Sequence, residues 1–294
     1  MVFALGLGGQ LVGVTHECDY PAGARGLPVL VKPALPLEQM SQAEIDVAVA
    51  ARLREGRSLY EIDEDLLRAL APDLILAQDL CQVCAPSGNE LSRALTHLPH
   101  QPEVLWMTPR TLSGVRENIR ALGQATAREA AAACLLADWD RRLAAVAARG
   151  AGLARRPRVF CMEWLDPIYC AGHWAPEMVR LAGGHDGLGR EGGDSVRVAF
   201  QEVIDFAPEV LILMPCGFAL PQALEQARLV TQYPGWRDLP AVVAGEVYVV
   251  DANAYFARPG PRLVEGAELL GHILAGGSWS GPADALARVD LSAG

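Results

Sequence analysis

Four side chains that can bind a metal ion lie in two short motifs of the sequence. His16 and Cys18 form an H-x-C motif, and Cys81 and Cys84 form a C-x-x-C motif. Each motif follows an apolar run that predicts a strand, so we expect the two motifs at the ends of neighbouring strands. Four such ligands could hold zinc tetrahedrally or an iron–sulfur cluster, and a C-x-x-C pair can also cycle as a dithiol. The alternative is that they are small residues of a cleft that pack against a ligand.

The sequence contains none of the common catalytic motifs. It has no G-x-S-x-G nucleophile, no Walker A loop and no H-E-x-x-H pair. Glu163 and Asp166 flank Trp164 and could act as a carboxylate pair, but a hairpin turn explains them equally well. The sequence therefore favours a protein that is not an enzyme.

The composition is that of an acidic globular protein. The chain has 294 residues, 51% of them hydrophobic and 20% charged, and a net charge of −10. Nucleic acids and anionic membranes bind concentrated basic faces, so neither is expected as a partner, and no run of about 18 apolar residues predicts insertion into a membrane. Seven cysteines without disulfide-type spacing, and an N-terminus without the pattern of a signal peptide, indicate a cytoplasmic protein.

Two similar stretches of the chain predict two α/β lobes. Residues 65–73 (DLLRALAPD) and 201–209 (QEVIDFAPE) align without gaps, and each leads into an apolar run, DLILAQ and EVLILM respectively. Such continuous apolar runs are typical of strands buried on both faces of a parallel sheet. Ligands of open α/β sheets bind beyond the carboxyl ends of the strands, so we expect the functional residues there.

A stretch rich in helix-forming residues separates the two lobes. Residues 111–149 contain no proline, and their apolar residues recur at spacings of three and four. This pattern predicts one long helix that connects the lobes rigidly, and the alternative is two shorter helices broken near Gly123. Cys134 within this stretch and Cys161 within a later strand are expected in the core.

Several segments, by their order and spacing, resemble a known family. These segments are Val12–Pro21 (VGVTHECDYP), Leu70–Ala77 (LAPDLILA), Ala171–Trp174 (AGHW) with Leu181–Gly184 (LAGG), and Tyr255–Arg262 (YFARPGPR). The chain resembles the class III periplasmic-binding-protein-like clamshells, the helical-backbone type that serves ABC importers of cobalamin, haem and iron–siderophores, and it is most similar to the cobalamin-binding members. The resemblance covers nearly all of residues 1–275 and implies two lobes, a rigid helix between them and a ligand between the lobes.

Three departures from the family pattern change what we expect. Family members have a strand before the segment that begins here at Val2, so we expect the first strand, and the true start codon, upstream of Met1. The family also implies docking to an importer permease through an acidic residue on each lobe. Asp65 matches on the first lobe, whereas Gln201 occupies the second position with Glu202 beside it. With no export signal visible, we expect a cytoplasmic corrinoid binder rather than an importer component.

A set of aromatic residues near predicted strand ends suits the flat apolar contact that a corrin requires. The expected ligand-binding residues are Tyr20, Trp164, His173, Trp174, Phe218, Tyr255, Phe256 and Arg258. For the aromatic residues, the alternative is packing within a lobe. Arg258 could donate to amides or a phosphate of the ligand or form a surface salt bridge, and His173 could coordinate cobalt or bond to the backbone.

We therefore predict an α/β protein with two parallel-sheet lobes joined by one long α-helix, a clamshell with its ligand cleft between the lobes. The predicted segments are a first lobe over 1–110, the helix over 111–150, a second lobe over 151–276 and a loosely held tail over 277–294. The predicted function is non-enzymatic binding of a small molecule, namely cobalamin, another corrinoid, or a related tetrapyrrole or iron chelate. The alternative is a cytoplasmic metal protein, or an iron–sulfur or redox protein, that uses Cys18, Cys81 and Cys84.

Overall fold

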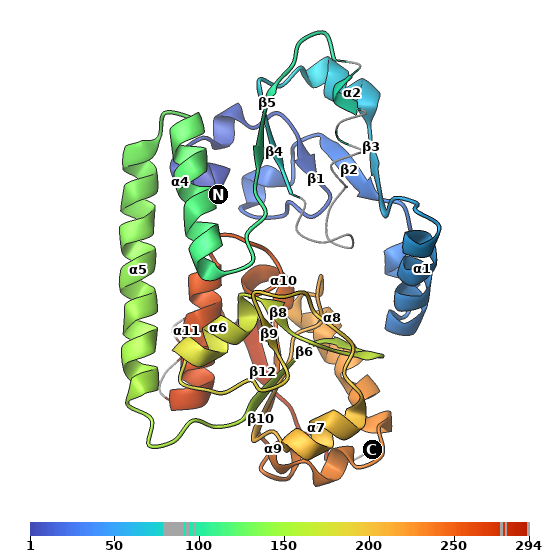
Figure 1. The fold of residues 1–294 in the computed structure, drawn as a ribbon, viewed down its shortest axis with the longest axis vertical. Helices are drawn as coiled ribbons and strands as arrows, with labels where there is room; N and C mark the ends of the chain where they lie inside the picture. The colour runs from blue at the N-terminus through green and yellow to red at the C-terminus, as the bar shows by residue number, and fades with distance from the viewer. Residues whose placement is uncertain (79–90, 92–93, 97, 277–278, 280, 293–294) are drawn as a thin grey trace. The chain divides into compact units, whose positions relative to one another are not determined.

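The chain folds into two units that each combine helices with strands. A computed structural model describes residues 1–78, 91, 94–96, 98–276, 279 and 281–292, and Figure 1 shows its helices and strands. Unit 1 comprises Met1–Pro109 and Arg116–Leu136, and unit 2 comprises Arg110–Val115 and Ala137–Gly294. Among the described residues, no helix has both the length and the hydropathy needed to cross a membrane.

Unit 1 contains two small sheets. In the first, β2 pairs parallel to β1 and antiparallel to β3, and in the second, β4 pairs parallel to β5. The strands are β1 Val14–Thr15, β2 Val29–Pro33, β3 Tyr60–Ile62, β4 Leu74–Ala77 and β5 Glu103–Trp106. Helical segments before β5 include η1 Val2–Leu5, η2 Gly8–Gln10, η3 Ala22–Ala24, η4 Leu37–Gln39, α1 Gln42–Arg54 and α2 Glu64–Leu70. A capping box opens α1, because the Glu44 backbone N–H donates to Ser41 Oγ and the Ser41 N–H donates to Glu44.

Unit 2 is built on a five-stranded sheet in the order β12–β11–β10–β6–β7. The three central strands are parallel and the two edge strands antiparallel to them. The strands of unit 2, including a separate parallel pair β8–β9, are β6 Val159–Leu165, β7 Ile168–Cys170, β8 Gly172–His173, β9 Arg190–Glu191, β10 Val210–Leu213, β11 Val247–Val250 and β12 Leu286–Arg288. All four residues of β10 are buried, as its apolar run predicts.

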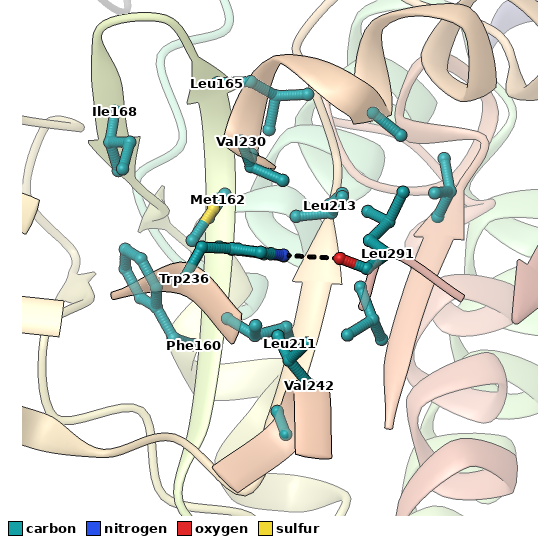
Figure 2. Close-up of a cluster of buried hydrophobic side chains, with 14 of the residues drawn as sticks. Phe160, Met162, Leu165, Ile168, Leu211, Leu213, Val230, Trp236, Val242 and Leu291 are labelled. Atoms are coloured by element: carbon teal, nitrogen blue, oxygen red, sulfur yellow. Dashed lines mark hydrogen bonds between the residues drawn. The ribbon is translucent and has the colours of Figure 1, made fainter. Parts of the chain in front are cut away.

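Short helices cover this sheet and carry much of the core of unit 2. They are α6 Ala175–Leu181, α7 Phe200–Phe206, α8 Leu220–Gln226, η5 Ala227–Gln232, η6 Trp236–Asp238, α9 Pro240–Val243, α10 Ala252–Tyr255, α11 Leu263–Ala275 and η7 Ala283–Ala285. On one face of the sheet, Phe160, Met162 and Leu211 pack against the buried Trp236 (Figure 2). The parallel strands with covering helices confirm the predicted α/β class.

The repeated motif folds in the same way in both units. Helix α2 ends at Ala71 with φ 43°, and helix α7 ends at Ala207 with φ 50°. Both alanines adopt the left-handed conformation, which ends a helix and is seldom used by residues other than glycine and asparagine. Each is followed by a proline and then by a parallel strand, which is half-buried in β4 and buried in β10. The gapless alignment of the two stretches therefore corresponds to a structural repeat.

The prediction of a single long connecting helix is wrong. The stretch forms two helices, α4 Leu112–Ala125 and α5 Glu129–Ala151, and Ala127 between them has φ 52°. A Cβ atom added to Gly123 would lie 2.6 Å from Ala132 Cβ and 3.3 Å from Arg128 O. The absence of a side chain at Gly123 therefore permits the start of α5 to pack closely against the end of α4, and this tertiary contact outweighs the helix propensity of the linking residues. Cys134 is exposed on α5, contrary to prediction, whereas Cys161 is buried as expected.

The prediction of a loosely held tail is also wrong for the described residues after 280. Strand β12 pairs antiparallel with β11, which places it at the edge of the sheet. Trp236 Nε1 donates to Leu291 O at 3.2 Å, as Figure 2 shows, and Leu291 is buried. The glycine- and serine-rich composition suggested disorder, but a few apolar residues suffice to extend a sheet when an unpaired edge is available.

Candidate ligand-binding site

The carboxyl ends of the parallel strands in unit 2 bring together several of the predicted residues. Trp164 lies at the end of β6 and Phe218 in the loop after β10, and their ring centroids are 5.8 Å apart in an edge-to-face arrangement. Backbone hydrogen bonds join the loops, because Cys216 N donates to Glu163 O and Asn253 N donates to Phe218 O. The predicted strand-end cluster therefore exists for the ends of β6, β10 and β11.

A register shift in β6 orients Trp164. The shift lies between Met162 and Trp164, and both Met162 and Leu165 belong to the buried cluster of unit 2. Without an irregularity, Trp164 would share a face with Met162, since side chains alternate along a strand. The shift instead turns Trp164 to the opposite face, a common effect of bulges near functional sites.

Two residues that the sequence analysis missed extend this arrangement. Tyr169 on β7 is the direct partner of Trp164, so the two side chains project from the same face of the sheet. Tyr169 in turn forms an isolated bridge with Arg197, whose Cζ lies 5.9 Å from the Tyr169 ring centroid. We call Phe218, Trp164 and Tyr169 the aromatic row, with Arg197 at its end. In the sequence, only the turn Asp166–Pro167 indicated that β7 pairs with β6, because it predicted a hairpin at this point.

Beneath these residues lies a buried carboxyl group. Glu163 accepts hydrogen bonds from Gly172 N at 3.1 Å and from Ser195 Oγ. Burial raises the pKa of Glu163, and the two hydrogen bonds and the nearby His173 act in the opposite direction. A Cβ on Gly172 would lie 2.6 Å from both Gly193 O and Ser195 N, so only glycine allows the loop to approach and donate to Glu163.

His173 lies within this polar network. Its φ is 52°, its side chain is buried, and Nε2 is 3.3 Å from Asp194 Oδ1. Asp194 also accepts a hydrogen bond from Arg110 Nη1 at 2.9 Å. Asp194 therefore lies within ion-pair distance of the ring, and coordination of cobalt by His173 stays a prediction.

Three of the predicted aromatic residues lie in the interior of unit 2. Trp174, Tyr255 and Phe256 are 3%, 6% and 2% exposed. Trp174 Nε1 donates to Phe256 O at 2.7 Å, which satisfies its polar atom inside the protein. Their burial favours the packing alternative, and their contact with a ligand stays a prediction. Arg258, in the segment after α10, is half-buried, and its role as a ligand donor likewise stays a prediction.

In unit 1, the predicted residues near the end of β1 have mixed environments. Tyr20 is 62% exposed. His16 lies with Nδ1 3.2 Å from Val31 O and Nε2 3.3 Å from Glu17 Oε1, and Cys18 Sγ is 3.5 Å from Thr15 Oγ1. Each ring nitrogen of His16 therefore lies close to a protein oxygen.

The proposed metal cluster finds no support in the described part of the chain. Cys81 and Cys84 lie outside the described residues. Among the residues that the structure does describe, no group of three or more histidine, cysteine, aspartate or glutamate side chains could hold a metal ion. The prediction of zinc or an iron–sulfur cluster therefore has no geometric basis here.

One further aromatic residue of unit 1 was missed. Trp106 is the last residue of β5 and is 43% exposed. It lies at the carboxyl end of a parallel strand, where ligands of α/β sheets bind. Its signal in the sequence was a tryptophan at the end of an apolar strand, EVLW.

Comparison with known proteins gives a consistent family. The model of the periplasmic binding protein family matches residues 1–254. The vitamin B12-binding protein of Vibrio parahaemolyticus serotype O3:K6 is 24% identical over 264 residues, which cover 89% of this chain and 80% of that protein.

Solved structures show the same fold. The periplasmic vitamin B12 binding protein BtuF of Vibrio cholerae superposes with a TM-score of 0.65 at 22% identity, covering 93% of this chain and 91% of that chain. A periplasmic haem-binding protein from Pseudomonas aeruginosa superposes with a TM-score of 0.71 at 19% identity, covering 97% and 92%.

These findings correct the predicted location and identify the family. The expectation of a cytoplasmic protein is wrong, because the family and both solved relatives are periplasmic. Members of this family bind solutes and are not enzymes. Since its model matches most of the sequence, the chain belongs to the family of periplasmic binding proteins.

Proposed function

We propose that this protein binds a flat macrocyclic ligand, a corrinoid or a related tetrapyrrole or iron chelate, outside the cytoplasm and delivers it to an ABC importer. The observation that carries the proposal is the edge-to-face pair of Trp164 and Phe218 at the carboxyl ends of β6 and β10. Relatives that are named for binding vitamin B12 and haem support the class of ligand.

The chemistry of the aromatic row suits such a ligand. Trp164, Phe218 and Tyr169 are all half-buried, so each has its apolar surface partly accessible. Flat aromatic surfaces give a rigid macrocycle a large contact area at little cost in side-chain entropy. The loops are fixed to each other through backbone hydrogen bonds, which orders the site before the ligand arrives.

Delivery to an importer is supported by the acidic residue of unit 1. Asp65 lies in the first turn of α2, its side chain is 92% exposed, and it pairs with Arg68 at 2.7 Å. At the equivalent place on α7, Gln201 Nε2 donates to Asp205, and Glu202 accepts from Ala199 N within its own helix. We propose that a permease binds unit 1 through Asp65.

The test is calorimetric titration with three probes, cyanocobalamin, dicyanocobinamide and haemin, each followed in parallel by its visible absorption. We expect at least one probe to bind with a Kd of about 1 μM or tighter. Trp164→Ala should weaken this binding by about tenfold or more, since a buried aromatic contact contributes more than about 1.4 kcal/mol.

The matched control is Trp279→Ala, which removes the same side chain beside His272 at the end of α11. The proposal predicts that this variant keeps the Kd of the wild type. Absence of binding by all three probes, or equal losses in the two variants, would contradict the proposed ligand or the proposed site.

A further inference from the structure

The aromatic row ends in a positively charged side chain. Trp164, Tyr169 and Arg197 occupy paired positions on three adjacent segments, β6, β7 and residues 196–198. Directly paired positions project to one face of a sheet, so an indole, a phenol and a guanidinium follow each other across that face.

The backbone of Arg197 is held in place on both sides. Cys170 N donates to Val196 O and Val198 N donates to Ile168 O, each at 3.0 Å. The segment therefore extends the sheet beyond β7, and Arg197 has a defined position relative to Tyr169.

The side chain of Arg197 is oriented as well. Its Nε donates to Tyr169 Oη at 3.2 Å, while Cζ lies 5.9 Å from the centre of the same ring. These two contacts fix the plane of an exposed guanidinium. A pre-oriented guanidinium suits bidentate recognition of carboxylate or phosphate, which a flexible ammonium group does not provide.

We propose that Arg197 binds an anionic substituent, a carboxylate or a phosphate, on the rim of the flat ligand that contacts the aromatic row. This inference rests on the proposed function and adds a requirement to it, namely that the ligand carries a negative charge at its periphery. The aromatic residues contact the macrocycle, and Arg197 selects for the charged substituent.

A structural role makes a different prediction. If Arg197 only stabilised the edge of the sheet, its loss would weaken the binding of charged and neutral ligands equally. If Arg197 recognises an anion, its loss weakens the binding of the charged ligands only. This loss of affinity is smaller at high salt, where the attraction between Arg197 and the anion is screened.

The experiment compares ligands that differ in the anionic group. Haemin carries two carboxylates that its dimethyl ester lacks, and cyanocobalamin carries a phosphodiester that dicyanocobinamide lacks. Dissociation constants are measured for the full chain and its Arg197→Ala, Arg197→Lys and Arg237→Ala variants. Arg237, an exposed arginine on η6 of the same unit, is the matched control.

We expect Arg197→Ala to weaken binding of the charged member of a pair by about fivefold to tenfold and to leave the neutral member within about twofold. Arg197→Lys should lie between these values, and Arg237→Ala should match the wild type. An effect confined to the haem pair identifies a carboxylate, and one confined to the corrinoid pair identifies a phosphate.

Two other results would each overturn a different claim. Equal weakening of the charged and neutral members, unchanged by salt, would refute the role of Arg197 and leave the proposed function intact. If the wild-type protein bound none of the four ligands, the proposed function itself would fail.

Discussion

Replacement of Asp186 by asparagine should change how the stability of the protein depends on pH. Asp186 lies in the turn after α6, and its Oδ1 accepts hydrogen bonds from Leu188 N at 3.2 Å and Gly189 N at 2.8 Å. Its Oδ2 is buried. Burial raises the pKa of Asp186 from 3.8 to about 7, although the hydrogen bonds oppose this shift.

The direction of the effect follows from proton linkage. Between pH 3.8 and about 7, the folded protein retains a proton on Asp186 that the unfolded chain releases. The wild type therefore loses stability, relative to a variant without this carboxyl group, as pH rises through this interval, by about 1.4 kcal/mol per pH unit. The total loss is at most about 4 kcal/mol, and because the residue is only partly buried we expect about 2 kcal/mol.

Urea denaturation at pH 4, 5.5, 7 and 8 measures this difference for the wild type and Asp186→Asn. The amide oxygen can accept the same two hydrogen bonds, but a buried NH2 group takes the place of Oδ2, which has no hydrogen-bond partner among the described residues. The variant therefore pays an additional cost of roughly 1–3 kcal/mol that does not depend on pH. The informative quantity is thus the slope, against pH, of the difference in free energy of unfolding between the wild type and the variant. The comparison requires that the two proteins have equal m-values. A difference that stays constant between pH 4 and 7 would refute the reasoning.

Three further predictions concern the packing of the chain. Gly123→Ala should destabilise the protein by about 1–3 kcal/mol, because the new Cβ would lie 2.6 Å from Ala132 Cβ. If urea denaturation instead showed a stabilisation of about 1 kcal/mol, as expected in a continuous exposed helix, it would contradict the helical hairpin. Trp174→Phe should cost about 1–3 kcal/mol, since it leaves the Phe256 carbonyl without its donor, and an unchanged urea midpoint would contradict a buried role. Deletion of residues 283–294 should lower the thermal midpoint, because it removes β12 and the buried Leu291, whose burial contributes about 2–5 kcal/mol. An unchanged midpoint would indicate that the tail contributes nothing to stability.

The parts of the fold that the sequence predicted correctly are those that depend on local pattern. Both continuous apolar runs form parallel strands, of which β10 is buried as predicted and β4 is half-buried. The repeated motif ends both α2 and α7 at an alanine in the left-handed conformation. Backbone propensity and burial on both faces act within about ten residues, so a single stretch of sequence contains the necessary information.

The parts that were predicted incorrectly depend on contacts between distant residues. Gly123 and Ala132 meet because α5 turns back on α4, and the helical pattern on each side is the same for a straight helix and for a hairpin. Likewise, the composition of the tail gave no sign of Trp236, whose indole binds Leu291 O from 55 positions away.

In the candidate site, too, residues placed by local pattern were predicted, and residues placed by distant contacts were missed. Trp164 and Phe218 were found because both follow apolar strands, and the carboxyl ends of parallel strands converge. Tyr169 and Arg197 were missed because their place beside Trp164 depends on the register of β7 and on the bridge at Arg197. The same strand-end reasoning gave no means of distinguishing half-buried Trp164 from buried Trp174, since both tryptophans lie near the ends of strands.

Hydrogen–deuterium exchange with and without a saturating probe tests the location of the site most directly. Cyanocobalamin and haemin are added separately, and exchange is followed in peptides that cover residues 163–170 and 214–218. The account predicts that the probe that binds slows exchange in both peptides, because the ligand covers the aromatic row and stiffens the loops after β6 and β10. Tight binding with unchanged exchange in these two peptides would show that the ligand sits elsewhere and would contradict the account.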